Sequence, residues 1–192
     1  MNLTLEIKDL RKQNDEKDKK IQALENRLAD LEQYTRLNDL IITGLDVKPR
    51  TYARAVVPDV EPNEKDLESV EQQVVRFMQN KGIALDSRDI EACHLLPRKD
   101  KQLKPAIILR FTNRKQKHAL LKQGRNLKGT NVYINEHLTK KNADIAKQAR
   151  LLRKQNKIQA TWTSNCRVFI KLNGIPELAK VLWIKDINEL DT

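Results

Sequence analysis

Basic side chains in the last third of the chain have a spacing suited to binding phosphate groups. Along a predicted helix, basic residues recur at steps of three, four and three, at Lys147, Arg150, Lys154 and Lys157. Such a stripe can bind successive phosphates, and Arg adds a fork that holds one phosphate in two places or stacks on a base. A solvated helix face looks the same, so the helix alone leaves both interpretations open.

The hairpin predicted after this helix favours nucleic acid as the ligand. Arg167, Phe169 and Lys171 alternate along one strand and therefore share one of its sides. Basic residues interleaved with an aromatic ring are what a groove for a single strand requires. Trp162 on the preceding strand is a second stacking candidate, with a position in the core as the alternative.

The net charge of +11 is spread unevenly along the 192 residues. Residues 1–37 sum to zero, residues 38–92 to −4 and residues 93–192 to +15. Positive charge concentrated in one part of a folded protein favours a polyanionic partner, with nucleic acid ahead of an anionic membrane surface. A basic protein whose lysines only face water is the alternative.

Side chains that could support catalysis or bind a metal ion are scattered. His94, His118 and His137 show no zinc-ligand spacing, and Cys93 beside His94 offers two of the four ligands that zinc needs. The sequence contains no Gly-rich phosphate loop and no Ser or Cys in a nucleophile motif. We therefore expect no enzymatic activity, no cofactor, no metal ion and no small-molecule substrate.

The cysteine count and the hydropathy pattern indicate a reducing compartment. Two cysteines, Cys93 and Cys166, are too few for a disulfide framework. No apolar run approaches the ~18 residues of a transmembrane helix, and no signal peptide opens the sequence. We expect a chain that neither spans a membrane nor is secreted.

An N-terminal heptad repeat is expected to bring several copies of these basic surfaces together. Apolar residues return at alternating steps of four and three, which gives four heptads between Leu3 and Leu31. One helix cannot bury such a stripe alone, so residues 1–37 are predicted to form a coiled coil that presents the later domains in several copies. Position a is taken by Ile7, Asn14, Ile21 and Leu28, and position d by Leu3, Leu10, Lys17, Leu24 and Leu31.

The number of helices in the coil is set by weaker signals. Leu and Ile are mixed at positions a and d, which leaves dimer and trimer open. Arg27 at position g and Glu32 at position e flank an apolar a and d pair, an order that resembles the motif of short trimeric coils and favours a trimer. A solvated charge pair is the alternative. Asn14 and Lys17 cost stability in the core but fix the register.

Residues 38–136 alternate between strand and helix signals. The order strand, helix, strand, strand, helix, strand is that of a split βαβ, ferredoxin-like domain. The Pro-containing residues 46–62 are predicted to form a long, mobile loop. Strands are predicted at residues 40–45, 90–96, 106–111 and 131–135, and helices from Asn63, with Asp66 in its first turn and an apolar stripe from Leu67 to Met78, and from Asn113 to Leu121.

Residues 137–192 form a smaller predicted domain. The fold class is therefore α+β, with an N-terminal coiled coil, a βαββαβ domain and a small C-terminal domain. The C-terminal elements are a helix at residues 139–154, a hairpin at residues 158–163 and 167–172 around Ser164-Asn165, and a last helix from Pro176 that carries Leu178, Val181, Leu182 and Ile184.

A basic split βαβ domain suggests an RNA recognition motif, but its two diagnostic strands lack the rings on which bases stack. Ile41 replaces the aromatic of the first strand, and Ala106 and Ile108 replace those of the second. Lys104 and Arg110 share this open face by strand alternation and are candidate RNA contacts. Because an exposed apolar patch is unusual, we expect the C-terminal domain or the linker after the coil to cover part of it, with nucleic acid in the cleft between the domains.

The order of these segments resembles the first-open-reading-frame (ORF1) proteins of LINE-type retrotransposons. The resemblance is carried by residues 34–45, 90–95 with 104–121, and 134–153 leading into the hairpin, and it spans essentially the whole chain. It implies a homotrimer with a non-standard RNA recognition motif that binds single-stranded RNA, and also single-stranded DNA, with little sequence preference. It further implies packaging of the element's transcript in ribonucleoprotein particles, nucleic-acid chaperone activity, and a cytoplasmic location with the nucleus as a second one.

The resemblance also assigns residues. Family members place RNA-contacting arginines in the helix after the fourth strand and in the next hairpin, which here match Arg150, Arg153 and Arg167. Arg36 in the linker is a further candidate, and the loop of residues 46–62 departs from the shorter connection of the family. The alternative function is a coiled-coil scaffold whose basic globular end binds protein partners such as acidic tails.

Overall fold

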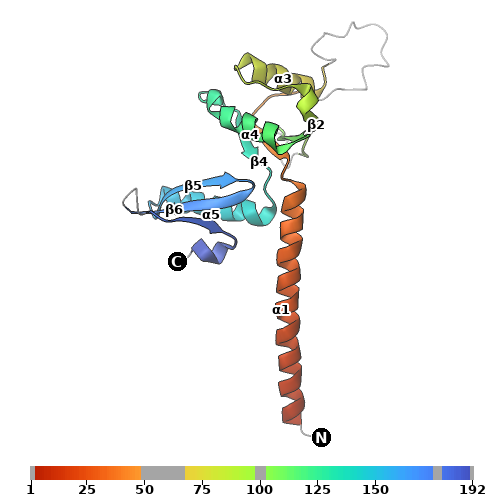
Figure 1. Cartoon of the computed structure of the whole chain (residues 1–192), viewed down its shortest axis with the longest axis vertical. Coiled ribbons are helices and arrows are strands. Elements are labelled where there is room, and N and C mark those ends of the chain that lie inside the picture. The colour runs from red at the N-terminus through yellow and green to blue at the C-terminus, as the bar shows by residue number, and fades with distance from the viewer. Residues whose placement is uncertain (1–2, 49–67, 98–102, 175–178, 191–192) are drawn as a thin grey trace, which may run out of the picture. The chain divides into compact units, whose positions relative to one another are not determined.

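The computed structural model of the chain describes residues 3–48, 68–97, 103–174 and 179–190 (Figure 1). It is a mixed α+β structure with a long N-terminal helix and antiparallel sheets. Contacts divide the chain into two units. The central unit comprises residues 37–137 with residues 163–166, and the terminal unit comprises the residues up to 36, residues 138–162 and the residues from 167 on.

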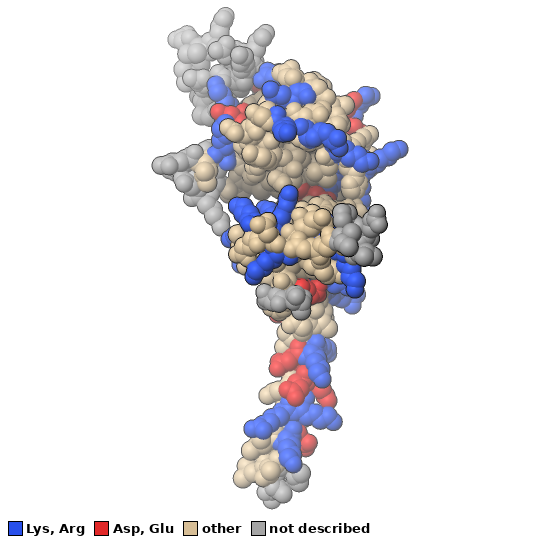
Figure 2. Space-filling model, turned by 90° about the vertical axis from the view of Figure 1, so that its left-hand side faces the viewer, with Lys and Arg blue, Asp and Glu red and all other residues tan. Residues whose placement is uncertain are grey.

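Helix α1 (Leu3–Thr35) is one unbroken helix of 33 residues. Its sequence contains no Gly or Pro that would interrupt it. Acidic and basic side chains alternate along its surface (Figure 2). The apolar positions of the heptads remain 48 to 73 % exposed in the single chain, at Leu3, Ile7, Leu10, Ile21, Leu24, Leu28 and Leu31.

The central unit is built on a four-stranded sheet. The strands lie in the order β2-β3-β1-β4, and each neighbouring pair is antiparallel. The predicted succession of strands and helices is found, and every strand boundary lies within two residues of the predicted one. The elements are β1 (Asp39–Thr43), α3 (Val70–Asn80), β2 (Ile90–Leu95), β3 (Ile107–Phe111), α4 (Arg114–Gln123) and β4 (Tyr133–Glu136), with the short 3-10 helices η2 (Ser87–Asp89) and η3 (Gly124–Leu127).

One face of this sheet is apolar and packs against the helices. Leu40 and Leu109 are fully buried in one cluster with Val74 and Met78 of α3 and Leu120 of α4. Strand alternation sends the next residues to the opposite face, and amphipathic spacing turns the apolar stripe of each helix toward the sheet. The sequence pattern therefore specifies which face of the sheet is covered by helices.

The opposite face carries the residues that replace stacking rings. Ile41 of β1 pairs with Ile108 of β3 across the antiparallel ladder. Ile108 is buried, and Ile41 and Ala106 are half-buried. Part of this apolar patch is therefore buried at Ile108, and its covering by the C-terminal domain or by the linker stays a prediction.

Strand β1 ends two residues earlier than the sequence predicted, because of Gly44. This residue has a φ of +84°, a conformation that side chains rarely adopt. A Cβ added here would lie 1.8 Å from the carbonyl oxygen of Asn131, so the close approach of the two backbones requires glycine.

The helices of the central unit begin at capped residues. Ser69 caps α3 in a capping box, in which the Ser69 hydroxyl accepts from the Gln72 backbone N–H and the Gln72 side chain accepts from the Ser69 N–H. Asn113 caps α4 as predicted and accepts from the Gln116 N–H. The predicted first turn at Asn63, Asp66 and Leu67 lies outside the described residues, and the prediction of one helix from there to Met78 is wrong at Glu68 and Ser69, which are not helical.

The terminal unit pairs α5 with a three-stranded sheet. The strands lie in the order β5-β6-β7. Ile145 and Ala149 of α5 pack on Val168, Ile170 and Ile184 of the sheet in a second buried cluster. The elements are α5 (Lys140–Lys154), β5 (Ile158–Ser164), β6 (Arg167–Leu172), β7 (Val181–Ile184) and the short 3-10 helix η4 (Ile187–Leu190).

The predicted last helix is wrong over residues 181–184, which form strand β7. Phe169 pairs with Trp183 and Ile170 with Leu182 in an antiparallel ladder between β6 and β7. Pairing with β6 and burial of Ile184 outweigh the helical spacing of the apolar residues, and short apolar runs do not distinguish helix from strand. Pro176 and Leu178 of the predicted helix lie outside the described residues.

The turn between β5 and β6 is shifted by one residue from its predicted place. Asn165 and Cys166 both have positive φ, of 52° and 60°, where Ser164-Asn165 was predicted to form the turn. Positive φ at both central residues is the property of the two-residue turn that matches the twist of a hairpin. Strand β5 therefore ends one residue later than predicted, at Ser164, and β6 has its predicted bounds.

Candidate nucleic-acid interface

Helix α5 presents a basic outer surface, here called the α5 basic stripe. It begins at Thr139, whose hydroxyl accepts from the Asn142 backbone N–H. Ile145 and Ala149 are buried, where the helical period of the sequence places an apolar stripe away from the basic one. On the described part of the chain, no acidic side chain forms an ion pair with any member of the stripe. The stripe consists of Lys147, Arg150, Arg153 and Lys154 of the helix and of Lys157, which lies three residues beyond its end, all exposed.

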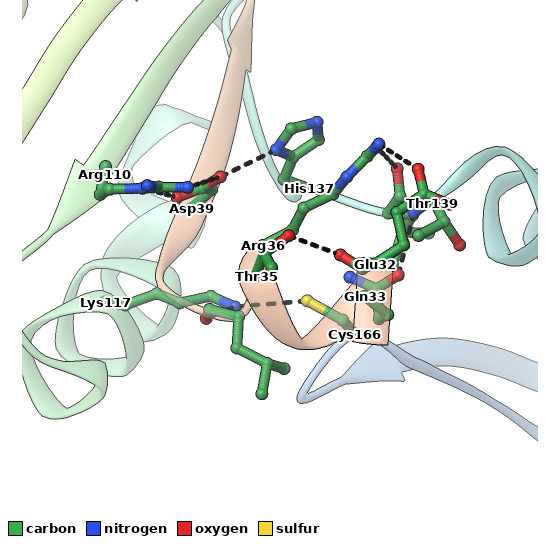
Figure 3. Close-up of polar contacts among 12 residues, drawn as sticks. Glu32, Gln33, Thr35, Arg36, Asp39, Arg110, Lys117, His137, Thr139 and Cys166 are labelled. Carbon is green, nitrogen blue, oxygen red and sulfur yellow. Dashed lines mark hydrogen bonds and ion pairs between the residues drawn. The ribbon is translucent and has the colours of Figure 1, made fainter. Parts of the chain in front are cut away.

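The end of α1 is hydrogen-bonded to the start of α5. The Gln33 side-chain oxygen accepts from the Thr139 backbone N–H and from the Asn142 side chain, each at 2.9 Å. Arg36 pairs with Glu32 and donates to the Leu138 carbonyl oxygen at 3.2 Å (Figure 3). Arg36 therefore helps to join two helices, and its predicted contact with RNA stays a prediction.

The open face of the β5-β6-β7 sheet carries three aromatic rings in a row. Trp162 of β5 and Phe169 of β6 are stacked, with ring centroids 5.9 Å apart and planes inclined by 13°. Trp183 of β7 is the direct cross-strand neighbour of Phe169. Cross-strand neighbours share one face of a sheet, so the three rings lie on the side away from the buried cluster.

Two cations lie on the Trp183 ring. The guanidinium carbon of Arg167 is 4.2 Å from the ring centroid and the Lys185 ammonium nitrogen is 4.4 Å from it. Both distances are typical of cation–π contacts. We call this surface, formed by Trp162, Phe169, Trp183, Arg167 and Lys185, the ring face.

Sequence reasoning missed Trp183 and Lys185. It placed Trp183 in a helix, where the residue would not align with Phe169. The sequence pattern that could have identified them is the alternation of Val181, Trp183 and Lys185. It places an aromatic and a basic residue on one side of a strand, as Arg167 and Phe169 are placed on the neighbouring strand. Strand alternation also places Lys171 on this side of the sheet.

The α5 basic stripe and the ring face lie on opposite sides of the terminal unit. Val168 and Ile170 of β6 point into the cluster with α5, and Arg167 and Phe169 alternate away from it. The α5 basic stripe points away from the same cluster on the far side. The sequence indicated nucleic-acid binding for both sets of residues without placing one relative to the other, and the structure assigns them to two separate surfaces.

The two candidate RNA contacts in the central unit, Arg110 and Lys104, differ in their surroundings. The Arg110 guanidinium binds Asp39 through two hydrogen bonds of 2.7 and 3.0 Å (Figure 3). Lys104 is half exposed, 4.0 Å from the Asp46 carboxylate. Arg110 thus links strands β1 and β3 through Asp39. Its predicted contact with RNA, like that of Lys104, stays a prediction.

Asp39 is a buried carboxylate held by two partners. Its side chain is 1 % exposed and also lies 3.1 Å from His137 Nδ1. Burial by itself raises the pKa of Asp39, but the hydrogen bonds from His137 and Arg110 outweigh it and lower the pKa to about 2. The charged form of Asp39 is therefore part of the folded state.

Replacing Asp39 by Asn is expected to flatten the acid dependence of stability. A pKa lowered from 3.8 to about 2 contributes about 2 kcal/mol, present in full above the unfolded pKa and lost as the pH falls from about 4 toward 2. Urea unfolding followed by circular dichroism between pH 6 and pH 2 should show this loss in the native chain and not in Asp39→Asn. Equal pH dependence of the two proteins would contradict the assignment.

A buried ion pair anchors the turn residue Cys166 within the central unit. Lys117 and Glu136 have side chains 1 % and 2 % exposed and are 3.1 Å apart. The Lys117 ammonium also donates to the Leu37 carbonyl oxygen at 2.8 Å and lies 3.6 Å from the Cys166 sulfur. The Cys166 backbone N–H donates to the other Glu136 oxygen at 3.0 Å. Sequence analysis did not identify Lys117, because nothing in its local context separates it from solvated lysines.

The cysteines lack the properties of reactive thiols. Burial raises the pKa of Cys93 to about 12 and that of Cys166 to about 11, although the positive charge of Lys117 opposes the shift at Cys166.

Among the described residues, no three His, Cys, Asp or Glu side chains are grouped closely enough to hold a metal ion. In the same part of the chain, no helix has the length and apolar character needed to cross a bilayer.

Comparison with known proteins gives no further assignment. No protein-family model matches the chain, and no curated protein matches it. Function is therefore inferred from the two surfaces of the terminal unit and from the uncovered stripe of α1.

Proposed function

We propose that this chain binds single-stranded RNA with little sequence preference and packages it as a coiled-coil homotrimer. The observation that carries the proposal is the α5 basic stripe, five exposed cations, four on α5 and Lys157 just after its end, without an acidic partner among the described residues. On the globular face visible in Figure 2, Lys and Arg side chains are more abundant than Asp and Glu side chains. Charges presented in this way favour the sugar-phosphate backbone, which is the same in every sequence.

The central unit fits an RNA recognition motif that has lost its usual binding surface. Its order of elements and its strand order β2-β3-β1-β4 support this proposal. Ile41 and Ile108 occupy the positions of stacking rings, Ile108 is buried, and Arg110 is paired with Asp39. RNA binding would then depend mainly on the terminal unit.

The exposed stripe of α1 supports oligomerisation. A helix of 33 residues spans about 50 Å, and its apolar positions are at least 48 % exposed in the single chain. Arg27 and Glu32 have the spacing that favours three helices. Three copies of a moderate site gain avidity, while ionic contacts allow each site to release, as nucleic-acid chaperone activity requires.

The resemblance to the ORF1 proteins of LINE-type retrotransposons supplies the biological setting of the proposal. In that setting the trimer coats the transcript of the element in ribonucleoprotein particles, located in the cytoplasm and also in the nucleus. No enzymatic step is required for this role, and the proposal includes none.

Replacing Arg150 and Arg153 together by Ala is expected to weaken RNA binding about 100-fold, since each charged contact contributes about 1.5 kcal/mol. The slope of log affinity against log salt should also become shallower by about 1.4, for two phosphates at about 0.7 each. Fluorescence anisotropy of a labelled 20-nucleotide oligouridylate across a salt series measures both quantities.

The matched control replaces Arg76 and Arg88 by Ala in the central unit. These arginines pair with Glu68 and Asp86, and their loss changes the net charge by the same amount. We expect the control to keep the affinity and the salt slope of the native chain within about threefold. Native affinity in the Arg150 and Arg153 variant would contradict the role of the stripe, and failure of the native chain to bind RNA at low salt would contradict the proposed function.

A further inference from the structure

Both tryptophans of the chain lie on the ring face. The sequence contains two Trp residues, and the structure places Trp162 on β5 and Trp183 on β7, with Phe169 between them on β6. The rings thus form a row across all three strands of the sheet. The core of the terminal unit does not use them, because its buried cluster lies on the other side of the sheet.

The rings are accessible and oriented for stacking. Trp162 and Trp183 are 40 % and 39 % exposed, although large aromatic side chains are mostly buried in folded proteins. Phe169 is half-buried, and its ring plane is nearly parallel to that of Trp162, inclined by 13°, so the two rings form a short stack that a base can extend. A flat exposed ring is what a nucleobase stacks on, and such stacking is tolerant of sequence because every base has a π-face.

The cations of the ring face lack acidic neighbours on the sheet. Arg167 and Lys185 both lie within 4.4 Å of the Trp183 centroid, and neither forms an ion pair among the described residues. The strands β5, β6 and β7 contain no Asp or Glu. Two like charges on one ring repel each other, and an anion bound beside them would relieve this repulsion. A phosphate next to a stacked base provides that anion.

We propose that the ring face is a stacking platform for unpaired nucleobases of RNA, on which Trp162, Phe169 and Trp183 take the bases and Arg167 and Lys185 take the adjoining phosphate. The proposal rests on the RNA binding proposed above and adds the part of RNA that this face recognises. Bases in a duplex are stacked on their neighbours and offer no free face. The ring face therefore selects single strands over duplexes.

The ring face and the α5 basic stripe then have separate roles. The two surfaces lie on opposite sides of the terminal unit, so a change in one does not touch the other. The stripe contributes affinity that falls with salt, because it neutralises phosphates. The rings contribute affinity that depends on the presence of bases and changes little with salt.

The test uses intrinsic tryptophan fluorescence, which reports only from this face because the chain has no other Trp. The full chain is titrated with a 20-nucleotide oligouridylate and with an abasic oligonucleotide of the same length and charge. We expect the oligouridylate to quench the Trp emission with the same midpoint as its anisotropy. The abasic strand should bind at low salt and leave the emission nearly unchanged.

Trp183→Leu removes one ring of the platform and keeps an apolar residue in β7. The affinity for oligouridylate should fall about tenfold, with an unchanged salt slope, and the affinity for the abasic strand should change less than about twofold. Trp183→Phe keeps a ring and should restore most of the lost affinity. Val181→Leu, an exposed aliphatic position on the same strand, is the matched control and should bind like the native chain.

Two results would overturn the platform. One is equal affinity of the native chain for the oligouridylate and the abasic strand without quenching, which would leave the proposed RNA binding intact and remove base stacking from it. The other is equal loss of binding to both strands in Trp183→Leu with a native circular dichroism spectrum. Failure of the native chain to bind either strand at low salt is a separate result and contradicts the proposed function itself.

Discussion

Replacing Leu24 and Leu28 together by Asp is expected to convert the trimer into monomers and to weaken binding to long RNA by a factor of about 10² to 10⁴. The two residues occupy consecutive d and a positions of the proposed coil and are 56 % and 67 % exposed in the single chain. Burying two carboxylates per helix in an apolar seam costs several kcal/mol per ion, on the order of the whole stability of a short coil. The monomer then loses the avidity that three linked sites provide.

The measurements separate assembly from intrinsic affinity. Light scattering after size-exclusion chromatography should give three times the chain mass of 22.3 kDa for the native protein and that mass itself for the variant. A short oligonucleotide that fills one site should bind both proteins equally, and only a long RNA should distinguish them.

The matched control places the same two acids on the outer surface of the coil. Gln22→Asp with Ala23→Asp uses a b and a c position of the heptad, both exposed, so the helix gains equal charge without a change in the seam. This variant should remain trimeric. A trimeric Leu24 and Leu28 variant would refute the coiled coil, and a monomeric one that binds long RNA as tightly as the native chain would refute the role of avidity.

Replacing Lys117 by Met is expected to destabilise the central unit by about 3–5 kcal/mol. Lys117 is 1 % exposed and holds Glu136 at 3.1 Å, so its removal leaves a carboxylate buried without its cation. The same change takes away the donor to the Leu37 carbonyl oxygen. Met fills a similar volume, so the effect reports the charge and not a cavity.

Each unit has its own probe of unfolding. Cys93 and Cys166 both belong to the central unit, and Cys166 is buried while Cys93 is half-buried, so pulsed labelling of the Cys166 thiol in urea follows that unit. Trp162 and Trp183 belong to the terminal unit, so their fluorescence follows the other one. The Lys117→Met transition should move to lower urea in the labelling experiment.

Two further variants identify the cause of the lost stability. Lys115→Met changes an exposed residue of the same helix and should alter the free energy of unfolding by less than about 0.5 kcal/mol. Adding Glu136→Gln to Lys117→Met removes the unpaired charge and should recover a large part of the loss, since Gln can still accept from the Cys166 N–H. A Lys117→Met protein within about 1 kcal/mol of the native one would show that the pair is not a buried charge pair.

The sequence by itself determined the elements whose patterns are local. The heptad spacing predicted α1, the cap at Asn113 predicted the start of α4, and alternation predicted which residues of β3 face the helices. The basic and apolar stripes of α5 followed from its helical period. Each of these depends on residues within a few positions of one another, where capping and amphipathicity act.

The tertiary structure decided what depends on a distant partner. Residues 181–184 are a strand because β6 offers them a ladder, and this ladder brings Trp183 beside Phe169. Asp39 and Arg110 pair although 71 residues separate them, and Lys117 is buried by Glu136 and the turn at Cys166. Composition and periodicity do not encode such contacts, because the free energy of burying a charge or of pairing a strand depends on which segments meet.

The relative placement of the α5 basic stripe and the ring face also depended on tertiary packing. The basic residues of α5 and of β6 are close in sequence and similar in type, and the sequence did not say whether they share one surface. Packing of Ile145 and Ala149 against Val168 and Ile170 places the α5 basic stripe and the ring face on opposite sides of the unit. The sequence thus identified candidate residues by their type and spacing. The packing of helix on sheet determined on which side of the unit each of them lies.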